Sequence, residues 1–293
     1  MTNGPRVSVV MPFHNAGRHM DEAIRSVVTQ TFADWELLLV DDRSGDEGPA
    51  IARRFADGDA RIRLLSTDGG RFGAAAARNI AIATARGDYV AFLDADDLFG
   101  PHKLAHDVAA LECAPEAAWV YSATRWFFED EKRRDYRERL GVRRDRTYPP
   151  PDLLRHVILQ IRGDIPCTCG VMIRKAALDA VGGFEERFAL YEDQSLWVKL
   201  LLAYPVHVRS GCDAAYRQHD ASTSSMAVVS GAYDQHGSHS ARDAFLGWIE
   251  DYAEEHDAPP SIFRAIDKAK RENEGRGRSP MARLMMRLNR LFY

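Results

Sequence analysis

Three carboxylates close together in the first half of the chain have the residue types and spacing of a cation site. Asp94, Asp96 and Asp97 follow directly after the apolar segment Tyr89–Leu93. Close acidic side chains repel one another by about 1 kcal/mol or more per pair at an effective dielectric near 20. A bound cation offsets that repulsion, and oxygen ligands favour Mg²⁺ or Mn²⁺. A strand followed by a polar turn and a helix cap would leave the same pattern.

Other polar clusters of the first half also follow apolar segments that we predict to be buried strands. The strands are predicted at Val7–Met11, Trp35–Val40 and Ile62–Leu65, with helical spacing of apolar residues between them. Alternating strands and helices predict an α/β fold class, with a doubly wound, mainly parallel sheet and flanking helices. Ligands bind beyond the carboxyl ends of such strands. The residues at these ends are Pro12, Phe13 and His14 after the first strand, and Asp41 and Asp42 after the second.

The second half has a weaker pattern. Trp119–Phe128 is predicted to be one strand, and the charged stretch Glu129–Arg146 an exposed loop or short solvated helix. Val206–Val208 and Ala214–Arg217 are predicted to be edge strands.

Two acids, Glu192 and Asp193, stand directly before the apolar run Leu196–Leu201. Acidic residues are common in the first turn of a helix, because they interact favourably with its dipole. A capping role is therefore the ordinary interpretation of this pair.

The last part of the chain differs in charge from the rest. Residues 262–293 contain nine Lys or Arg and three Asp or Glu, although the whole chain has a net charge of −4. Lys270–Ser279 is predicted to be a linker. Met281–Tyr293 places apolar residues on one helical face and arginines on the other. Such a helix could lie on an anionic membrane surface, pack on its own domain or contact a second copy of the chain.

Bulk properties indicate an ordinary globular protein of 293 residues with 45% hydrophobic and 28% charged residues. The net charge gives no reason to expect a nucleic-acid partner. The four cysteines lack the spacing of a zinc site and are expected to be free thiols. No segment has the apolar length of a membrane span, and the N-terminus does not resemble a signal peptide. We therefore expect a cytoplasmic protein, possible attachment being at the inner face of the membrane.

The ordered set of segments resembles the family 2 inverting glycosyltransferases, which have the GT-A fold. The resemblance covers roughly residues 6–222 and implies a GT-A domain at 1–224. Residues 225–293 lie outside it, and their own pattern predicts a helical C-terminal extension with a basic amphipathic end. The nucleotide-binding half would be about 1–125 and the acceptor-binding half about 126–224. The matching segments are VSVVMPFHN (7–15), LLLVDDRSGD (37–46), AARNIAIATARGDYVAFLDADD (76–97), GGFEERFALYEDQSLWVKL (182–200) and YRQH (216–219).

The resemblance implies transfer of one sugar from a nucleotide-diphosphate sugar, with UDP as the expected carrier, to a hydroxyl of a glycan or lipid-linked glycan acceptor. A single displacement inverts the anomeric centre. By the same resemblance Asp193 is the base that deprotonates the acceptor, and Glu192 positions substrate. The Gln-x-x-Arg-Trp motif of processive members is absent from the sequence. Transfer of a single sugar is therefore expected rather than chain synthesis.

The resemblance also implies the donor contacts. Asp96 is expected to ligate Mn²⁺ or Mg²⁺, and Asp94 to face the ribose or a metal-bound water. Asp97 would either join them or cap the next helix. Arg78 would contact the base or diphosphate, or else pair with the acidic cluster as a structural ion pair.

At the base of the nucleotide, Asp42 is expected to accept from an imide N–H, with the backbone of Pro12, Phe13 and His14 alongside. His219 would approach the diphosphate or the metal. Two alternatives stay open: a nucleotide-sugar-binding protein without turnover, and a sugar-nucleotide pyrophosphorylase. The second would carry a glycine-rich, basic signature after the first strand, which PFHNAG lacks. The donor sugar, linkage and oligomeric state cannot be inferred from the sequence.

Overall fold

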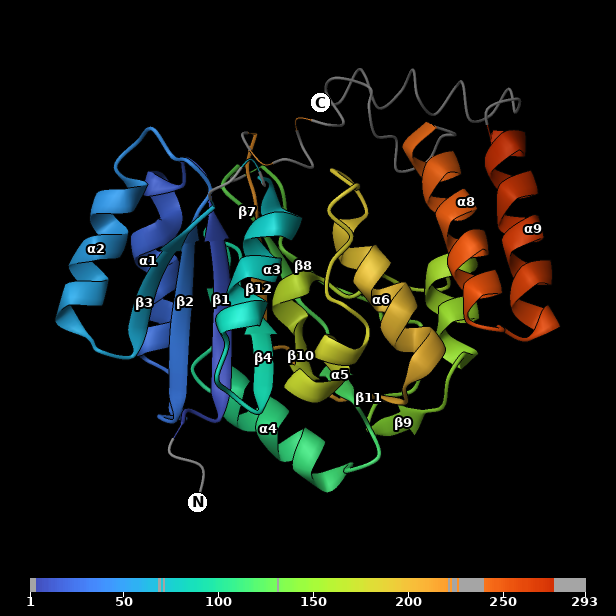
Figure 1. Ribbon diagram of the computed structural model, residues 1–293, viewed down its shortest axis with the longest axis horizontal. Helices are drawn as coiled ribbons and strands as arrows, with labels where there is room; N and C mark the ends of the chain where they lie inside the picture. The colour runs from blue at the N-terminus through green and yellow to red at the C-terminus, as the bar shows by residue number, and fades with distance from the viewer. Residues whose placement is uncertain are drawn as a thin grey trace.

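A computed structural model describes residues 4–67, 70, 72–130, 132–220, 222, 226 and 240–276. An eight-stranded mixed sheet lies at the centre of the molecule, with helices on both of its faces (Figure 1). In spatial order its strands are β3 (Ile62–Ser66), β2 (Trp35–Asp41), β1 (Val7–Phe13), β4 (Tyr89–Phe92), β10 (Val171–Arg174), β6 (Trp119–Tyr121), β11 (Val206–Val208) and β9 (Arg146–Tyr148).

The first four strands in that order are parallel, and their register aligns the polar clusters. Pairing of β1 with β2 runs from Val7 opposite Trp35 to Phe13 opposite Asp41. On its other side β1 pairs with β4, with Val10 opposite Phe92. The carboxyl ends of β1, β2 and β4 therefore lie together at one end of the sheet. Because β1 has β2 on one side and β4 on the other, the strand order reverses here, which is where open α/β sheets bind ligands.

A second, smaller sheet lies beside the carboxylates. It has the order β5 (Leu98–Phe99), β12 (Ala214–Gln218), β7 (Arg125–Phe128) and β8 (Tyr136–Arg137). The helices are α1 (Gly17–Val28), α2 (Gly48–Gly58), α3 (Ala74–Thr84), α4 (Lys103–Cys113), α5 (Lys175–Ala180), α6 (Glu192–Ala203), α8 (Ser240–Glu255) and α9 (Pro260–Arg276), with a π-helix at Leu154–Leu159 and a 3₁₀ turn at Thr168–Gly170.

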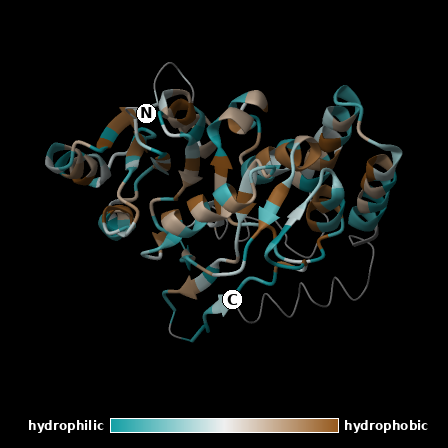
Figure 2. Ribbon diagram, turned by 90° about the horizontal axis from the view of Figure 1, so that it is seen from below, coloured by the Kyte–Doolittle hydropathy of each residue, from teal (hydrophilic) through white to brown (hydrophobic). Residues whose placement is uncertain are grey.

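The alternating side chains of the strands belong to two hydrophobic cores. Val9 and Met11 of β1 pack in the core that includes residues of α1 and α4, whereas Val10 packs in the core that includes residues of α3, α6, α8 and α9. Figure 2 shows hydrophobic colour along the central strands and hydrophilic colour on the outward sides of the flanking helices. This alternation is why the predicted strands are almost continuously apolar.

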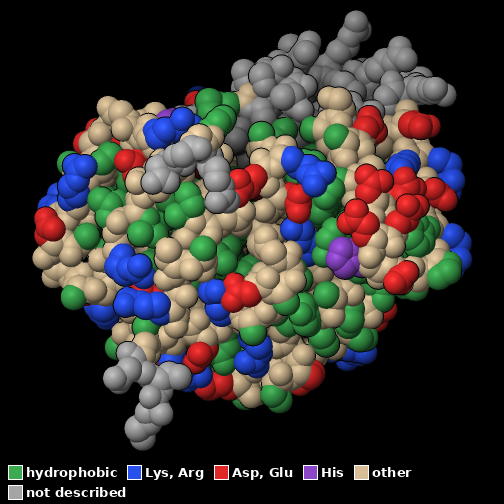
Figure 3. Space-filling model, in the orientation of Figure 1, with side chains coloured by type: hydrophobic (Ala, Val, Ile, Leu, Met, Phe, Trp, Pro, Cys, Tyr) green, Lys and Arg blue, Asp and Glu red, His purple; other side chains and the backbone are tan. Residues whose placement is uncertain are grey.

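Helices α8 and α9 lie side by side at one end of the molecule, opposite the end that carries α1 and α2 (Figure 1). Phe245 and Ile249 of α8 and Ile266 of α9 are fully buried in the second core. Acidic side chains gather on the surface at this end (Figure 3). The α8 helix contributes Glu250, Asp251, Glu254 and Glu255, three of them exposed.

The structure corrects several local predictions. Trp119–Phe128 is two strands, β6 and β7, which lie in different sheets. The strands β11 and β12 are not at sheet edges, since each has a neighbour on both sides. The predicted linker begins inside α9, which continues to Arg276. The charged stretch Glu129–Arg146 contains β8 and a buried carboxylate, Glu138.

No helix among the described residues is both long and apolar enough to cross a membrane. The predicted amphipathic segment Met281–Tyr293 lies outside the described residues, so its membrane or dimer contact stays a prediction.

Candidate active site

A buried arginine joins the two acidic segments, Asp94–Asp97 and Glu192–Asp193, which lie more than ninety residues apart in the sequence. Arg78 lies on α3 with its side chain 3% exposed. Its Nη2 donates to Oδ1 of Asp94 at 2.6 Å, and its Nη1 donates to Oε1 of Glu192 at 3.3 Å. The packing of α3 against β1 and β2 brings Arg78 to the carboxyl edge of the sheet. The arrangement is that of the ion pair with the acidic cluster, one of the two roles expected for Arg78.

Burial opposes the charge of Arg78, but the carboxylates of Asp94 and Glu192 outweigh it and raise the arginine pKa above its usual range. The guanidinium also lies 5.3 Å from the ring centre of Phe184. Its Nε is buried and has no hydrogen-bond partner among the described residues. Arg78 is therefore a fixed positive charge in a site that is otherwise acidic.

Asp193 lies next to this ion pair, in the first turn of α6. Its Oδ1 accepts the backbone N–H of Gln194 at 2.6 Å. Burial, and after it the charge of Glu192, raise the pKa of Asp193 to about 7 despite the opposing effect of Arg78. The side chain is nevertheless partly accessible to solvent. A carboxylate with these properties can accept a proton near neutral pH.

Asp96 and His219 form a second polar pair. Oδ2 of Asp96 lies 2.9 Å from Nε2 of His219, which follows directly after β12. The ring of His219 lies 5.1 Å from that of His19. Arg217 holds the backbone of Asp96 in place. Its Nε donates to the backbone oxygen of Asp96 at 2.8 Å, and its Nη2 donates to Glu22 at 2.6 Å.

The side chains of this pair fit a hard divalent ion whose remaining ligands come from the substrate and water. The described residues contain no group of three His, Cys, Asp or Glu side chains arranged to hold a metal. Asp96 and His219 nevertheless converge, and both are partly accessible, with side chains 27% and 11% exposed. Magnesium and manganese commonly keep only one or two protein ligands and take phosphate oxygens and water for the rest.

The contacts of Asp97 are structural. The expectation that Asp97 caps the next helix is wrong. Helix α4 begins only at Lys103, with β5 in between. The carboxylate of Asp97 is 1% exposed and accepts the backbone N–H of Arg217 at 2.9 Å. Burial and the charges of Asp96 and Asp94 raise its pKa well above the ordinary value.

The predicted base-binding residues form a third group, at the ends of β1 and β2. Asp42 accepts from Oγ1 of Thr67 and from the backbone N–H of Gly73, both at 2.7 Å. Nδ1 of His14 donates to the backbone oxygen of Asp42 at 2.7 Å. Phe13 is buried, and its oxygen accepts the N–H of Asp42 at 2.8 Å. Asp42 thus anchors the loop before α3.

Asp41, at the end of β2, and Asp46, in the loop after it, both accept hydrogen bonds that stabilise turns. Asp41 accepts the N–H of Ser44 at 2.9 Å. Asp46 accepts the N–H of Gly17 at 2.8 Å and that of Gly48 at 2.9 Å. Pro12 lies within β1, which continues one residue past it.

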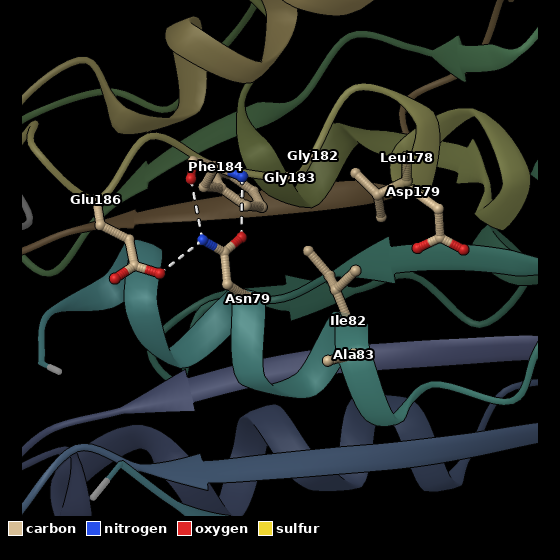
Figure 4. Close-up of a pocket in the computed structure, with 9 residues that line it drawn as sticks. All are labelled: Asn79, Ile82, Ala83, Leu178, Asp179, Gly182, Gly183, Phe184 and Glu186. Atoms are coloured by element: carbon tan, nitrogen blue, oxygen red, sulfur yellow. Dashed lines mark hydrogen bonds between the residues drawn. The ribbon is translucent and has the colours of Figure 1, made fainter. Parts of the chain in front are cut away.

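Asn79, beside Arg78 on α3, holds the segment that leads to the acid pair and was not among the predicted site residues. Its Oδ1 accepts the N–H of Phe184, and its Nδ2 donates to the backbone oxygen of Phe184 and to Glu186, each at 2.9 Å (Figure 4). These contacts line a pocket of about 460 Å³ between α3 and α5. The only sequence signal for this role is the position of Asn79 next to Arg78 within the segment 76–97.

Comparison with known proteins agrees with the geometry. Residues 8–182 match the model of glycosyl transferase family 2. The O-antigen biosynthesis protein RfbC of Myxococcus xanthus is 35% identical over 205 residues, which are 68% of this chain and 15% of RfbC. The Escherichia coli protein named UDP-Glc:alpha-D-GlcNAc-diphosphoundecaprenol beta-1,3-glucosyltransferase WfgD is 41% identical over 105 residues, which are 36% of this chain and 40% of WfgD. The chain therefore corresponds to less than half the length of either relative.

Among solved structures, S. aureus TarS 1-349 in complex with UDP superposes with a TM-score of 0.58 at 22% identity, covering 73% of this chain and 61% of the TarS 1-349 chain. At that identity the likeness concerns the fold, which is the GT-A fold expected from the sequence. The family match spans β1 to α5, and thus the strands that carry the polar clusters. The chain belongs to glycosyl transferase family 2.

Proposed function

We propose that this protein transfers a single sugar, with inversion, from a nucleotide-diphosphate sugar to a hydroxyl of a glycan or lipid-linked glycan acceptor. One observation carries the proposal: Arg78 joins Asp94 to Glu192, and so brings the acid pair of α6 to the carboxylates that follow β4. The name of WfgD, which specifies a UDP-sugar donor and a lipid-diphosphate acceptor, supports UDP and a lipid-linked glycan. Membership of the family favours a transferase over a pyrophosphorylase.

Asp193 is the base of the proposed reaction. In a single displacement the acceptor oxygen attacks the anomeric carbon from the face opposite the diphosphate, and its proton moves to Asp193 as the new bond forms. A base is most effective when its pKa lies near the working pH. The pKa of about 7 meets that condition. Glu192 is tied to Arg78 and would position substrate without taking the proton.

Asp96, with His219 beside it, would hold Mn²⁺ or Mg²⁺. When bound, the ion stabilises the negative charge of the leaving diphosphate. The imidazole of His219 suits Mn²⁺ better than Mg²⁺, which strongly prefers oxygen ligands. Asp94 faces the ribose or a metal-bound water and is held in place by its contact with Arg78.

The base of the nucleotide lies over the ends of β1 and β2. Asp42 accepts from an imide N–H there, using the acceptor capacity left by Thr67 and Gly73, beside the backbone of Pro12, Phe13 and His14. Arg78, which is buried, acts on the diphosphate through its positive charge and through the placement of Asp94 and Glu192.

We divide the chain into a GT-A domain at 1–224 and an extension at 225–293, and we place the protein in the cytoplasm.

Isothermal titration tests the donor site. UDP, GDP and dTDP are titrated into the protein with Mn²⁺ and again with EDTA. We expect UDP to bind only with the metal, and Asp96→Ala to weaken binding at least tenfold. Asp88→Ala is the matched control, because Asp88 is an exposed acid at the opposite end of the same strand.

The absence of binding by any of the three nucleotides, in folded protein with Mn²⁺ present, would overturn the proposal. Binding without any release of nucleotide from sugar nucleotides would instead favour the alternative of a binding protein without turnover.

A further inference from the structure

The residue directly before the acid pair has an unusual backbone conformation. Tyr191 precedes α6 with φ +72° and ψ 14°, in the left-handed region. Bulky residues other than glycine rarely adopt this conformation, and they keep it only where the surroundings impose it. The tyrosine side chain is buried, at 7% exposure. Packing around this ring therefore decides where α6 begins.

The ring that covers Tyr191 comes from the C-terminal extension. Phe245 of α8 stacks on Tyr191 with ring centres 4.7 Å apart and planes within 8°. Phe188, from the same loop as Tyr191, contacts Phe245 edge-on at 5.7 Å and Trp248 edge-on at 5.5 Å. Phe245 is fully buried. The loop before the acid pair is thus packed against one face of α8 by aromatic contacts.

Hydrogen bonds carry this placement into the first turn of α6. The backbone oxygen of Tyr191 accepts the N–H of Ser195 at 2.9 Å. Oγ of Ser195 donates to the backbone oxygen of Glu192 at 2.6 Å, and the side chain of Glu192 meets Arg78. A change in the conformation of Tyr191 would therefore move the backbone of both acids.

We propose that Phe245 is a positioning residue for Glu192 and Asp193: by stacking on Tyr191, helix α8 fixes the left-handed turn from which the acid pair projects. The inference rests on the proposed role of Asp193. The family match ends at residue 182 and the resemblance in sequence near residue 222, so neither includes α8. The extension is accordingly part of the catalytic arrangement.

Phe245→Leu tests the proposal, because leucine keeps an apolar side chain in the core but removes the stacked ring. Ile249→Ala is the control, since Ile249 is equally buried on α8 and lies one turn further along. Amide hydrogen exchange followed by mass spectrometry needs no substrate. We expect amides of residues 186–196 to exchange at least fivefold faster in Phe245→Leu than in the wild type, and unchanged in Ile249→Ala.

Turnover supplies the second readout, as nucleotide released from UDP-glucose with Mn²⁺. Phe245→Leu should lower kcat at least tenfold with little change in KM, because the donor strands are untouched. In the pH profile of kcat, the fall in rate at acid pH should occur at a lower pH in this variant than in the wild type, because a loosened turn lets water reach Asp193. Unchanged exchange together with an unchanged pH profile would overturn the proposal.

A second variant covers failure of Phe245→Leu to fold. Tyr191→Leu removes the other ring of the stack and leaves α8 intact, and it should give the same exchange and pH effects. Wild-type exchange in Tyr191→Leu would contradict the inference. Failure of the proposed function would be distinguishable from this. The wild type would then release no nucleotide, or Asp193→Asn would retain full turnover, while the effect of Phe245→Leu on exchange would persist.

Discussion

One buried cation organises the charges of the site. Arg78 meets Asp94 and Glu192 directly, and it also lowers the pKa of Asp193. Burial and the charge of Glu192 outweigh this effect, so that the pKa of Asp193 is raised to about 7. The three acids could be identified from their positions beside predicted elements, and Arg78 from the family resemblance. The sequence could not predict that Arg78 joins Asp94 to Glu192, because that contact spans 114 residues and depends on how α3 and α6 pack.

The titration of Asp193 gives a pH prediction. A raised pKa means that the protonated, inactive form predominates below about 7 and the basic form above it. We expect kcat/KM for nucleotide release to rise with pH, tenfold per unit on the acid side, and to level off above an apparent pKa near 7. The measurement is a pH–rate profile from 5 to 9 in buffers of constant ionic strength.

The matched variant for this profile is Asp193→Asn, which keeps the size of the side chain but cannot take a proton. Loss of a general base costs roughly 10²- to 10⁴-fold in rate. The variant should show that loss and no acid limb near 7. A variant that kept the same limb would assign it to another group.

At the scale of elements, the sequence predicted the strands of the first half and their polar ends. It failed where long-range pairing decides the structure. The ten residues from Trp119 are rich in aromatic and apolar side chains at both ends, yet the first three pair with β10 and β11 and the last four with β12. Local periodicity contains no information about which sheet a strand joins. The same limitation hid Asn79, whose partners lie 105 to 107 residues away.

Two adjacent glycines allow the turn held by Asn79 to be tested. Gly182 and Gly183 both have positive φ, 76° and 69°. A Cβ on Gly182 would meet nothing within 4 Å, whereas one on Gly183 would lie 2.5 Å from Oδ1 of Asn79. Either substitution by alanine costs about 1–2 kcal/mol for the left-handed backbone. Only Gly183→Ala also displaces Asn79 from Phe184.

We therefore expect Gly183→Ala to lower the free energy of unfolding by about 1–3 kcal/mol more than Gly182→Ala, which is the cost of unpaired buried polar groups. Urea denaturation of the two variants measures the difference. Equal losses would show that Asn79 moves aside freely and does not hold the turn.

At the scale of the molecule, the eight-stranded sheet separates two cores, and the larger of them includes both Val10 of β1 and Ile266 of α9. The chain thus buries the C-terminal helices against elements of the GT-A domain. The sequence predicted helices in this region but gave no reason to place them in the same core, because their apolar spacing fits any partner.

A shared core predicts cooperative unfolding. Ile266→Ala should lower the free energy of unfolding by about 2–5 kcal/mol and shift one transition, seen together by far-ultraviolet circular dichroism and tryptophan fluorescence. Lys268→Ala, on the same helix with a side chain 53% exposed, should change it by less than about 0.5 kcal/mol. Two separate transitions would indicate that the extension unfolds on its own.

The two cores also differ in when a growing chain can complete them. The core on the α1 side uses residues between Val7 and Ala214, whereas the other needs residues as late as Ala269. During synthesis the N-terminal part folds first. One face of the sheet can therefore be covered while the ribosome is still translating α8 and α9, and until those helices emerge Tyr191 lacks the ring of Phe245. A nascent chain would acquire the strand ends that we propose bind the nucleotide before it acquired a fixed acid pair.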